Sequence, residues 1–324
     1  MLLSRDQLLN MYRKMVEARR FEEKVVELFY AAKIPGFLHS AIGQEAIAAG
    51  IGAALEPQDR ITIHHRGHGH CIAKGLDMKK MMAELFAKKT GYCGGKGGSM
   101  HLADFDSGML GANGIVGGSI PHAVGVALAD KMRGTGAVTV CCFGDGASNQ
   151  GAFHEALNLA SIWKVPVVFF CENNLYGMTV PQSYHQAIRN ISDRAVGYGM
   201  PGVTIDGNDV LEVYVTVRRA LDRARKGDGP TLIEAKTYRH RGHWEGDPDA
   251  TEELYRPREE IEMWKARDPV VTFERELKER GYISEEEVKA IDEEARRKIE
   301  EAIAFAEDSP EPDISEALTD IYTD

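Results

Sequence analysis

A glycine–aspartate–glycine turn and a pair of asparagines are the residues best suited to carry chemistry in this sequence. Gly144, Asp145 and Gly146 directly follow one apolar run, Asn173 and Asn174 end a second one, and 26 residues separate Gly146 from Asn173. Ligands of open α/β sheets bind at the carboxyl ends of parallel strands, so both groups would share one edge if the two strands are neighbours. A carboxylate oxygen of Asp145, an amide oxygen of Asn174 and a nearby backbone carbonyl are ligands that suit Mg²⁺.

The surroundings of this predicted metal site favour an anion as a further ligand. Glycines on both sides of Asp145 let the main chain approach an anion closely, and the helix expected from residue 149 would present its N-terminus to it. Because protein-bound Mg²⁺ usually shares its shell with phosphates and water, we predict a Mg²⁺–diphosphate site. A Gly-Asp-Gly turn or an asparagine pair alone is usually structural, whereas their spacing across a strand–helix–strand unit is far more specific.

Two other motifs could indicate a different ligand site, but each is less specific than the Gly-Asp-Gly turn with its asparagine pair. Residues 197–202 match Gly-x-Gly-x-x-Gly, but they precede a strand and include Pro201, so we interpret them as a turn and not as a dinucleotide site. Four histidines fall within residues 64–70. Arg66 would put a cation inside that ligand set, and no cysteine or carboxylate with ligand spacing completes it, so we expect an anion-facing loop and no zinc.

The elements that would position these residues alternate along the middle of the chain. The expected strands, such as residues 165–171, show no alternation of apolar and polar side chains, which is typical of strands buried on both faces of a parallel sheet. We therefore predict an α/β fold with a doubly wound, mostly parallel sheet. Helices are expected at residues 44–55, 78–88, 120–132, 149–163 and 210–226, and strands at 60–64, 138–143, 165–172, 203–206 and 231–236.

Long loops and helical ends complete the predicted organisation. The glycine-rich stretch 90–118 has the length of functional loops, and a polar loop spans residues 238–258. Ser4 with Gln7, and later Ser284 with Glu287, form capping-box patterns that begin helices towards the two ends of the chain. We predict three parts: an N-terminal helical extension (1–35), an α/β domain (36–268) and an acidic C-terminal helical extension (269–324).

The charge distribution argues against some classes of partner. The chain of 324 residues has a net charge of −11, and its last 41 residues carry 15 acidic and 4 basic side chains, which leaves the rest neutral. Without a basic stripe to replace phosphate counterions, we expect no nucleic-acid partner. The acidic residues of the last helix are interpreted as a solvated face, with an acidic docking surface as the alternative.

Cysteine usage and hydropathy indicate the compartment. Five cysteines, an odd number without metal-ligand spacing, favour free thiols in a reducing cytoplasm. Arg5 and Asp6 interrupt the apolar run that a signal peptide would need. The uncharged stretch 107–129 contains six glycines as well as Asn113 and Pro121, so we do not interpret it as a membrane span. We expect a cytoplasmic protein without a membrane partner.

Beyond the predicted diphosphate site, the sequence resembles alpha subunits of the first component of 2-oxo acid dehydrogenase complexes. Residues 144–146 followed by Asn173 and Asn174 are similar to the thiamin diphosphate motif, and the similarity extends over residues 21–268 with a highly specific order of motifs. The resemblance implies a thiamin diphosphate-binding fold, with thiamin diphosphate and Mg²⁺ as cofactors. The other matching segments are residues 95–101, 114–117, 144–151, 163–166, 238–243 and 255–261.

The resemblance also implies roles for single residues. It places Asp145, Asn174 and the carbonyl of Tyr176 on Mg²⁺, and it makes His39 and His243 active-site histidines. In this family the glutamate that relays protons to the aminopyrimidine belongs to a beta subunit, so we expect an α2β2 heterotetramer that works with a lipoyl-bearing acyltransferase. The remaining implied cofactor contacts are Arg66 and His243 at the diphosphate, Gly144, Gly146 and Ala147 along the turn, and Gly114 and Val116 at the aminopyrimidine.

The resemblance leaves the substrate open. Residues 65–70 and 110–118 look closest to acetoin dehydrogenase, with pyruvate as the second candidate and branched-chain 2-oxo acids as the third. His65 stands where pyruvate-type subunits commonly have tyrosine, and Trp244 stands where mitochondrial pyruvate-type chains carry a regulatory serine. An inactive structural or regulatory subunit is the alternative, and the complete set of implied metal and diphosphate residues argues against it. A self-sufficient transketolase-like enzyme would need a longer chain.

Overall fold

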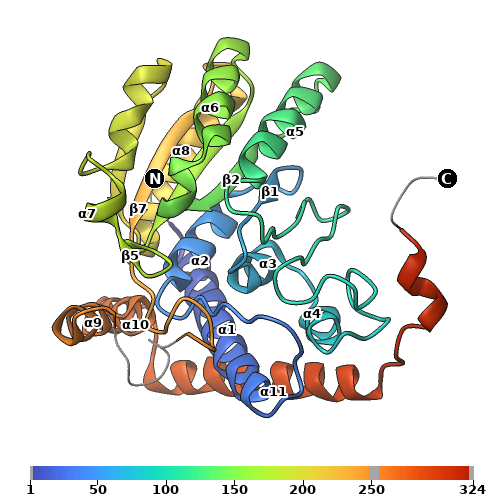
Figure 1. Cartoon of the computed structure of the whole chain (residues 1–324). Coiled ribbons are helices and arrows are strands. Elements are labelled where there is room, and N and C mark those ends of the chain that lie inside the picture. Colours follow the sequence, from blue (N-terminus) through green and yellow to red (C-terminus); the bar gives the residue numbers. More distant parts are fainter. Residues whose placement is uncertain (1–2, 248–254, 321–324) are drawn as a thin grey trace.

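The apolar runs in the middle of the chain form one parallel sheet. The computed structural model describes residues 3–247 and 255–320, so part of the expected 238–258 loop, residues 248–254, lies outside the described residues. Strands β1 (Arg60–Thr62), β2 (Thr139–Gly144), β3 (Val167–Asn173), β7 (Thr231–Lys236) and β6 (Gly202–Asp206) lie side by side in this order, all parallel (Figure 1). The predicted α/β class with a parallel sheet is confirmed.

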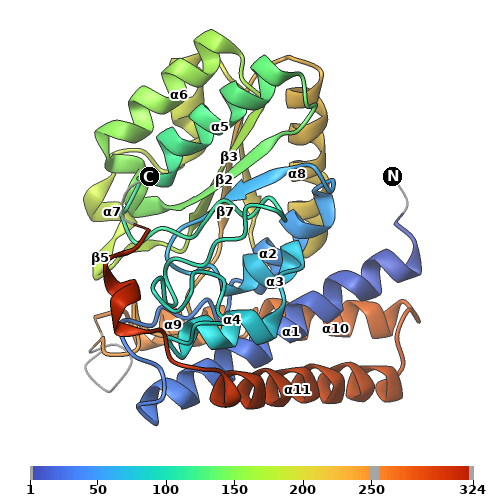
Figure 2. The same ribbon diagram turned by 90° about the vertical axis from the view of Figure 1, so that its right-hand side faces the viewer.

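Helices cover both faces of the sheet because both faces are apolar. Within β2, Val140 and Cys142 belong to one hydrophobic core, whereas Cys141 and Phe143 belong to another. Figure 2 shows α5 and α6 on one side of the strands and α8 on the other, which explains why the strand sequences do not alternate. The first core is closed by α1 (Arg5–Tyr30), α2 (Glu45–Ala54) and α8 (Val210–Arg225), and the second by α5 (Ser119–Arg133) and α6 (Gly151–Trp163).

A layer of helices lies below the sheet in Figures 1 and 2. Both predicted capping boxes are present, at Ser4 with Gln7 and at Ser284 with Glu287. The apolar stripe of the last helix, which includes Ile299, is part of the same core as α1, so the two ends of the chain pack together. Besides α1, the layer contains α3 (His68–Lys74), α4 (Met78–Leu85), α9 (Arg258–Lys265), α10 (Pro269–Glu279) and α11 (Glu285–Asp308).

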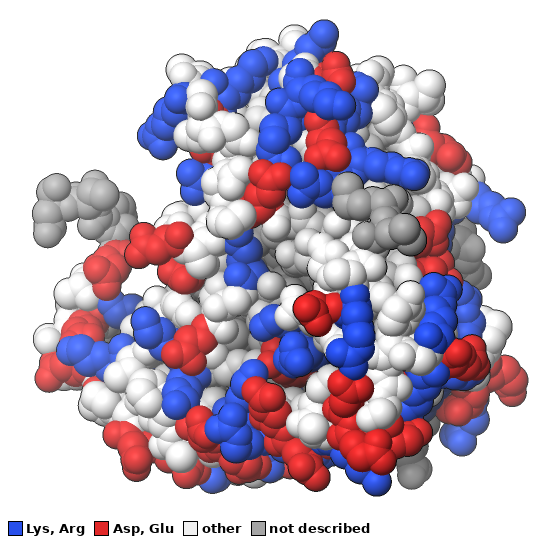
Figure 3. All heavy atoms as spheres, turned by 180° about the vertical axis from the view of Figure 1, so that it is seen from behind, with Lys and Arg blue, Asp and Glu red and all other residues white. Residues whose placement is uncertain are grey.

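The acidic residues of α11 lie at the surface, where some of them pair with bases in α1 or just after it. Lys24 lies 3.2 Å from Glu300, and Lys33 lies 2.6 Å from Glu307. Exposed pairs of this kind each contribute less than about 1 kcal/mol. Figure 3 shows acidic and basic side chains interspersed over this lower part of the molecule.

Some predicted boundaries differ from the structure. The histidine run was expected to form a loop, but helix α3 starts at His68, so the second half of the run is helical. A 3₁₀ turn (Asp145–Asn149) separates β2 from α6, because Ser148 Oγ donates a hydrogen bond to the Asp145 carbonyl at 2.7 Å and tightens the chain there. The loop 90–118 contains no helix or strand up to Ser119, as expected. Short elements that were not expected are β4 (Tyr176–Gly177), β5 (Val180–Pro181), α7 (Gln182–His185) and the 3₁₀ helices Ile191–Tyr198 and Ile314–Leu318.

The cysteines are unpaired, as predicted. All five carry free thiols, and Cys93 is the only one that is not buried. Burial raises the pKa of the other four thiols, which keeps them protonated and unreactive. Within residues 3–247 and 255–320, no helix combines the length and apolar character needed to cross a membrane.

Candidate active site

The carboxyl edge of the central strands brings the Gly-Asp-Gly turn and the asparagine pair together. Gly144 at the end of β2 pairs with Glu172 near the end of β3, so Asp145 and Asn174 follow neighbouring strand ends. The two strands are therefore neighbours, which is the condition that the sequence argument required.

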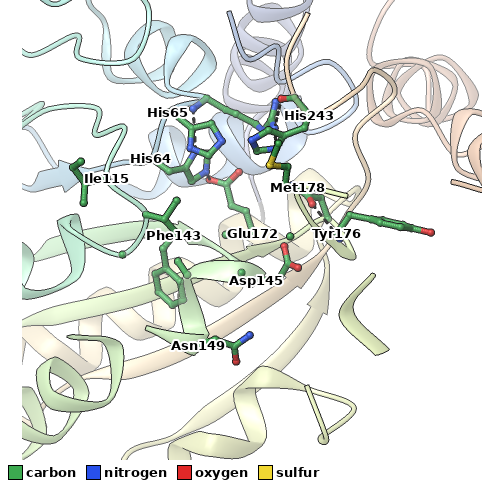
Figure 4. Close-up of a pocket in the computed structure, with 18 of the residues that line it drawn as sticks. His64, His65, Ile115, Phe143, Asp145, Asn149, Glu172, Tyr176, Met178 and His243 are labelled. Atoms are coloured by element: carbon green, nitrogen blue, oxygen red, sulfur yellow. Dashed lines mark hydrogen bonds and ion pairs between the residues drawn. The ribbon is translucent and has the colours of Figure 1, made fainter. Parts of the chain in front are cut away.

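A cavity of about 380 Å³ opens at this edge. Asp145 and Asn149 lie on one side of it, and His64, His65 and His243 lie on the other (Figure 4). Most of the predicted site residues line this single cavity: Arg66, Val116, Gly144, Asp145, Gly146, Ala147, Asn174, Tyr176 and His243.

Two predicted site residues, His39 and Gly114, do not line the cavity wall. The ring centroid of His39 lies 4.5 Å from that of His65 and 5.1 Å from that of His243, so His39 forms a second layer behind these histidines. Gly114 lies beside His101, whose Nε2 would be 3.3 Å from a Cβ built on Gly114.

The oxygen atoms at the strand ends fit a hard divalent cation. Asp145 is buried, its Oδ2 accepts a hydrogen bond from His185 Nε2 at 3.1 Å, and no lysine or arginine pairs with it among the described residues. Asn174 donates from Nδ2 to Gln44 Oε1 at 3.2 Å, and its Oδ1 accepts only a long contact of 3.4 Å from the Tyr176 N–H in the described part of the chain. Buried charges are normally paired or bound to metal, so this donor set suits Mg²⁺.

Two buried arginines lack an anionic partner. Arg66 donates to the carbonyl oxygens of Ser40 (2.8 Å) and His243 (2.6 Å), and Arg239 donates to the Met178 carbonyl (3.0 Å). Neither guanidinium pairs with a carboxylate within the described residues, and Nε and Nη1 of Arg239 have no hydrogen-bond partner there. Burial and the neighbouring Arg239 lower the pKa of Arg66 to about 9. An anion in the cavity would compensate the charge of Arg66, which lines it.

Three histidines at the cavity and behind it, His39, His65 and His243, are neutral at pH 7. Burial, with Arg66 and Arg239 nearby, lowers the pKa of His39 to about 3 and that of His243 to about 2. Burial and Arg66 also lower the pKa of His65. Nδ1 of His243 accepts from Arg66 Nη2 at 3.1 Å, so its proton belongs on Nε2.

The family of the chain follows from comparison with known proteins. The family model described as "Dehydrogenase E1 component" matches residues 13–315. The chain belongs to this family. The E1 chain is 51% identical over 99% of its length to the alpha subunit of acetoin:2,6-dichlorophenolindophenol oxidoreductase from Bacillus subtilis, of which it covers 95%.

Two further relatives show how the similarity is distributed. The corresponding subunit from Cupriavidus necator is 46% identical over 99% of the E1 chain and 95% of the relative. The alpha subunit of the pyruvate dehydrogenase E1 component from Zymomonas mobilis is 42% identical, with 98% of this chain and 89% of the relative covered. The predicted resemblance to alpha subunits of this family is confirmed.

Some residues of the cavity were not among the predicted site residues. Glu172 accepts from His70 Nε2 at 2.6 Å, and its Oε1 lies 3.1 Å from His64 Nε2. Burial alone would raise the pKa of Glu172, but these two histidines hold it below its usual range. The position of Glu172 directly before the asparagine pair was a usable signal. His185 gave none, because only the hairpin β4–β5 and helix α7 bring it to Asp145.

Proposed function

We propose that this chain is the alpha subunit of a thiamin diphosphate- and Mg²⁺-dependent dehydrogenase that cleaves acetoin and passes the acyl group to a lipoyl arm. The proposal rests on two groups that share one cavity. Oxygen atoms of Asp145 and Asn174, which suit a metal, have no lysine or arginine partner among the described residues, and the buried guanidinium of Arg66 has no carboxylate partner there. A Mg²⁺–diphosphate group would supply both missing partners. The names of the relatives at 51% and 46% identity support acetoin as the substrate.

The chain's own residues would hold the cofactor within a thiamin diphosphate-binding fold. We assign Mg²⁺ to Asp145, Asn174 and the Tyr176 carbonyl, and the diphosphate to Arg66 and His243. The backbone of the turn approaches β4 closely, since a Cβ built on Gly146 would lie 3.4 Å from the Cα of Gly177. The remaining assignments are Gly144, Gly146 and Ala147 along the turn and Gly114 and Val116 at the aminopyrimidine.

The protein residues orient the reactants and handle protons. When bound, thiamin diphosphate supplies a carbanion that adds to a carbonyl and a ring that accepts the electron pair of the cleaved bond. His39 and His243 are neutral, so each can donate from one ring nitrogen and accept at the other. Arg66 holds the His243 ring through Nδ1 and the carbonyl oxygen, which fixes the direction in which its Nε2–H can donate.

Charge favours a neutral substrate. Arg66 is the only lysine or arginine among the described residues that line the cavity, and the diphosphate would occupy it. His39, His65 and His243 are uncharged at pH 7. A substrate carboxylate, as in pyruvate, would therefore find no further lysine or arginine among the described residues that line the cavity, whereas acetoin carries no charge.

The proposed reaction is balanced with a lipoyl disulfide as the oxidant. Cleavage between the carbonyl and carbinol carbons of acetoin releases acetaldehyde, as the hydroxyl proton leaves. The remaining two-carbon fragment gives up two electrons to the disulfide and forms a thioester with one sulfur, while the other sulfur becomes a thiol. An artificial dye can replace the disulfide as the electron acceptor.

A beta subunit would complete the cavity. Ile115 and Val116 line it and are 72% and 49% exposed, and an exposed apolar rim of this kind is typical of an interface. We assign this rim to the beta subunit of an α2β2 heterotetramer, which would also supply the proton-relay glutamate. The lipoyl-bearing acyltransferase would then receive the acyl group.

The alpha subunit of a pyruvate dehydrogenase is the second candidate. The relative from Zymomonas mobilis at 42% identity supports it. It requires further cations near the cavity, which we assign to the beta subunit, because Arg66 is the only lysine or arginine among the described residues that line the cavity. A branched-chain 2-oxo acid dehydrogenase is the third candidate.

The test is a dye-reduction assay on the complex of this chain with its beta subunit. Acetoin, pyruvate and branched-chain 2-oxo acids are compared at saturating thiamin diphosphate and Mg²⁺. We expect the highest kcat/KM with acetoin. A value ten times higher with pyruvate, equivalent to about 1.4 kcal/mol of transition-state preference, would assign the chain to pyruvate dehydrogenase instead.

A further inference from the structure

A buried carboxylate organises the glycine-rich loop that the proposed function leaves unexplained. Glu84, in the last turn of α4, is fully buried. Its Oε2 accepts the backbone N–H groups of Cys93 (2.8 Å) and Gly95 (2.9 Å), and its Oε1 accepts those of Gly97 (2.8 Å) and Gly98 (3.0 Å). No lysine or arginine pairs with Glu84 in residues 3–247 and 255–320, so these four main-chain dipoles balance its charge.

The loop can wrap around the carboxylate because several of its residues are glycines. A Cβ built on Gly91 would lie 2.3 Å from Glu84 Oε2, so a side chain there would displace the carboxylate. Gly95 and Gly98 have φ angles of +80° and +63°, in the left-handed region that other residues rarely adopt. The glycine pattern therefore encodes a cradle of N–H groups, residues 91–98, around one side chain.

His101 connects this cradle to the cavity. Its Nδ1 donates to the Gly97 carbonyl at 3.0 Å, and a Cβ built on Gly114 would lie 3.3 Å from its Nε2, so the ring lies beside Gly114. The Leu102 carbonyl accepts the Ala112 N–H at 2.9 Å, which ties the two halves of the loop together. A shift of the cradle would therefore move the cavity wall that follows, which consists of Asn113, Ile115, Val116 and Gly117.

A second buried contact fixes the same stretch from another side. Ser99 Oγ lies 3.0 Å from His68 Nε2, and His68 Nδ1 lies 3.2 Å from Glu22 Oε2. All three side chains are buried. Residues 97–101 are thus held by α4 and, through His68, by α1 and α3 at once, and Glu84 is the residue that contacts the main chain directly.

We propose that Glu84 is a positioning residue for cofactor binding. Its carboxylate fixes the conformation of the cradle. Through His101 it also fixes the conformation of residues 113–117 of the cavity wall, so that this wall is shaped to bind the aminopyrimidine. Without the carboxylate, the four N–H groups lose their acceptor and the loop is less ordered. Cofactor binding must then also order the loop, which lowers the affinity for thiamin diphosphate. The inference rests on the proposed thiamin diphosphate site.

The experiment compares variants in the complex with the beta subunit. Glu84→Gln keeps the size of the side chain but turns an amide N–H₂ towards N–H donors, and Glu84→Asp keeps the charge on a shorter side chain. Lys89→Gln is the matched control, because it removes an exposed charge that pairs with Glu316 beside the same loop. We measure the half-saturating concentration of thiamin diphosphate, kcat at saturating cofactor, and trypsin cleavage after Lys96 within the cradle.

We expect Glu84→Gln to raise the half-saturating concentration at least tenfold and to keep kcat at saturation within about threefold of wild type. Cleavage after Lys96 should accelerate without cofactor and slow again when cofactor saturates the site. The half-saturating concentration of Glu84→Asp should lie between those of wild type and Glu84→Gln. If Glu84→Gln does not assemble with the beta subunit, Glu84→Asp provides the test. Lys89→Gln should match wild type in all three measurements.

The inference is overturned if the Glu84 variants bind cofactor as wild type does, or if kcat falls while the half-saturating concentration is unchanged. Faster cleavage after Lys96 with unchanged cofactor affinity would also contradict it, because the loop would then be uncoupled from the cavity. A wild-type complex that does not bind thiamin diphosphate would contradict the proposed function first and the inference with it.

Discussion

Arg66 donates a hydrogen bond of 2.6 Å from Nη2 to the carbonyl oxygen of His243, although 177 residues separate them in the sequence. The same nitrogen lies 3.1 Å from Nδ1 of His243. The guanidinium of Arg66 is held by neutral acceptors only, so it stays positively charged at the cavity. The pair joins residues 64–67 to the 238–247 segment and prepares a place for an anion.

Replacing Arg66 tests this anion site. Arg66→Lys should raise the half-saturating concentration of thiamin diphosphate by about 10- to 100-fold, because the loss of a hydrogen bond to a charged group costs about 1.5–3 kcal/mol. Titration of the two-chain complex by enzyme activity measures it. Arg133→Lys, an exposed change at the end of α5, is the control. Equal cofactor affinity in Arg66→Lys and wild type would contradict the assignment of the diphosphate.

The parallel sheet, and the edge of it where the proposed metal ligands lie, could be predicted because the local sequence pattern determines them. The run at residues 165–171 is apolar at every position, which is typical of a strand buried on both faces, so the same pattern predicted both the strand and its burial. Asp145 and Asn174 lie at strand ends, and neighbouring parallel strands must end at the same edge.

Other parts of the site could not be predicted because they depend on tertiary contacts. His185 reaches Asp145 through a hairpin and one turn of helix that carry no strong local signal. The role of Glu84 is encoded in glycines up to fourteen residues further along the chain, and only the folded loop shows what they surround. The division at residues 35 and 268 stays a prediction.

The stability of the isolated chain should fall in mild acid. The pKa of His39 is lowered to about 3 in the folded state, whereas an unfolded histidine has a pKa of about 6.5. Between these values the unfolded state binds more protons, so the contribution of neutral His39 is complete above pH 6.5 and is lost as the pH falls towards 3. The loss amounts to at most about 1.4 kcal/mol per pH unit.

Urea unfolding at pH 7, 6 and 5 measures this dependence. His39→Gln should reduce the slope of unfolding free energy against pH, because it removes the group that takes up the proton. His122→Gln, at an exposed position, should keep the wild-type slope. The same slope in His39→Gln and wild type would show that His39 is not held neutral.

The chain alone should be inactive with thiamin diphosphate, Mg²⁺ and acetoin. The apolar rim at Ile115 and Val116 is exposed in the single chain, and the proposed proton-relay glutamate belongs to the beta subunit. Dye reduction should appear when the beta subunit is added and should saturate at a 1:1 ratio of the chains. Full turnover by the purified single chain would refute the proposed heteromer.

The most direct test of the central claim is the Mg²⁺ dependence of thiamin diphosphate binding in wild type and in Asp145→Ala. Asp145 is the only charged side chain among the proposed metal ligands. In the wild-type two-chain complex, cofactor at one hundred times its dissociation constant should add about 2.7 kcal/mol of stability, and chelation of Mg²⁺ should abolish the gain.

Thermal unfolding with and without cofactor and Mg²⁺ provides the measurement. Asp145→Ala should show no gain under either condition, whereas Asp106→Ala, at an exposed position, should behave as wild type. A Mg²⁺-dependent stabilisation of the Asp145→Ala complex equal to that of wild type would contradict the account, because the metal would then bind somewhere other than the edge formed by β2 and β3.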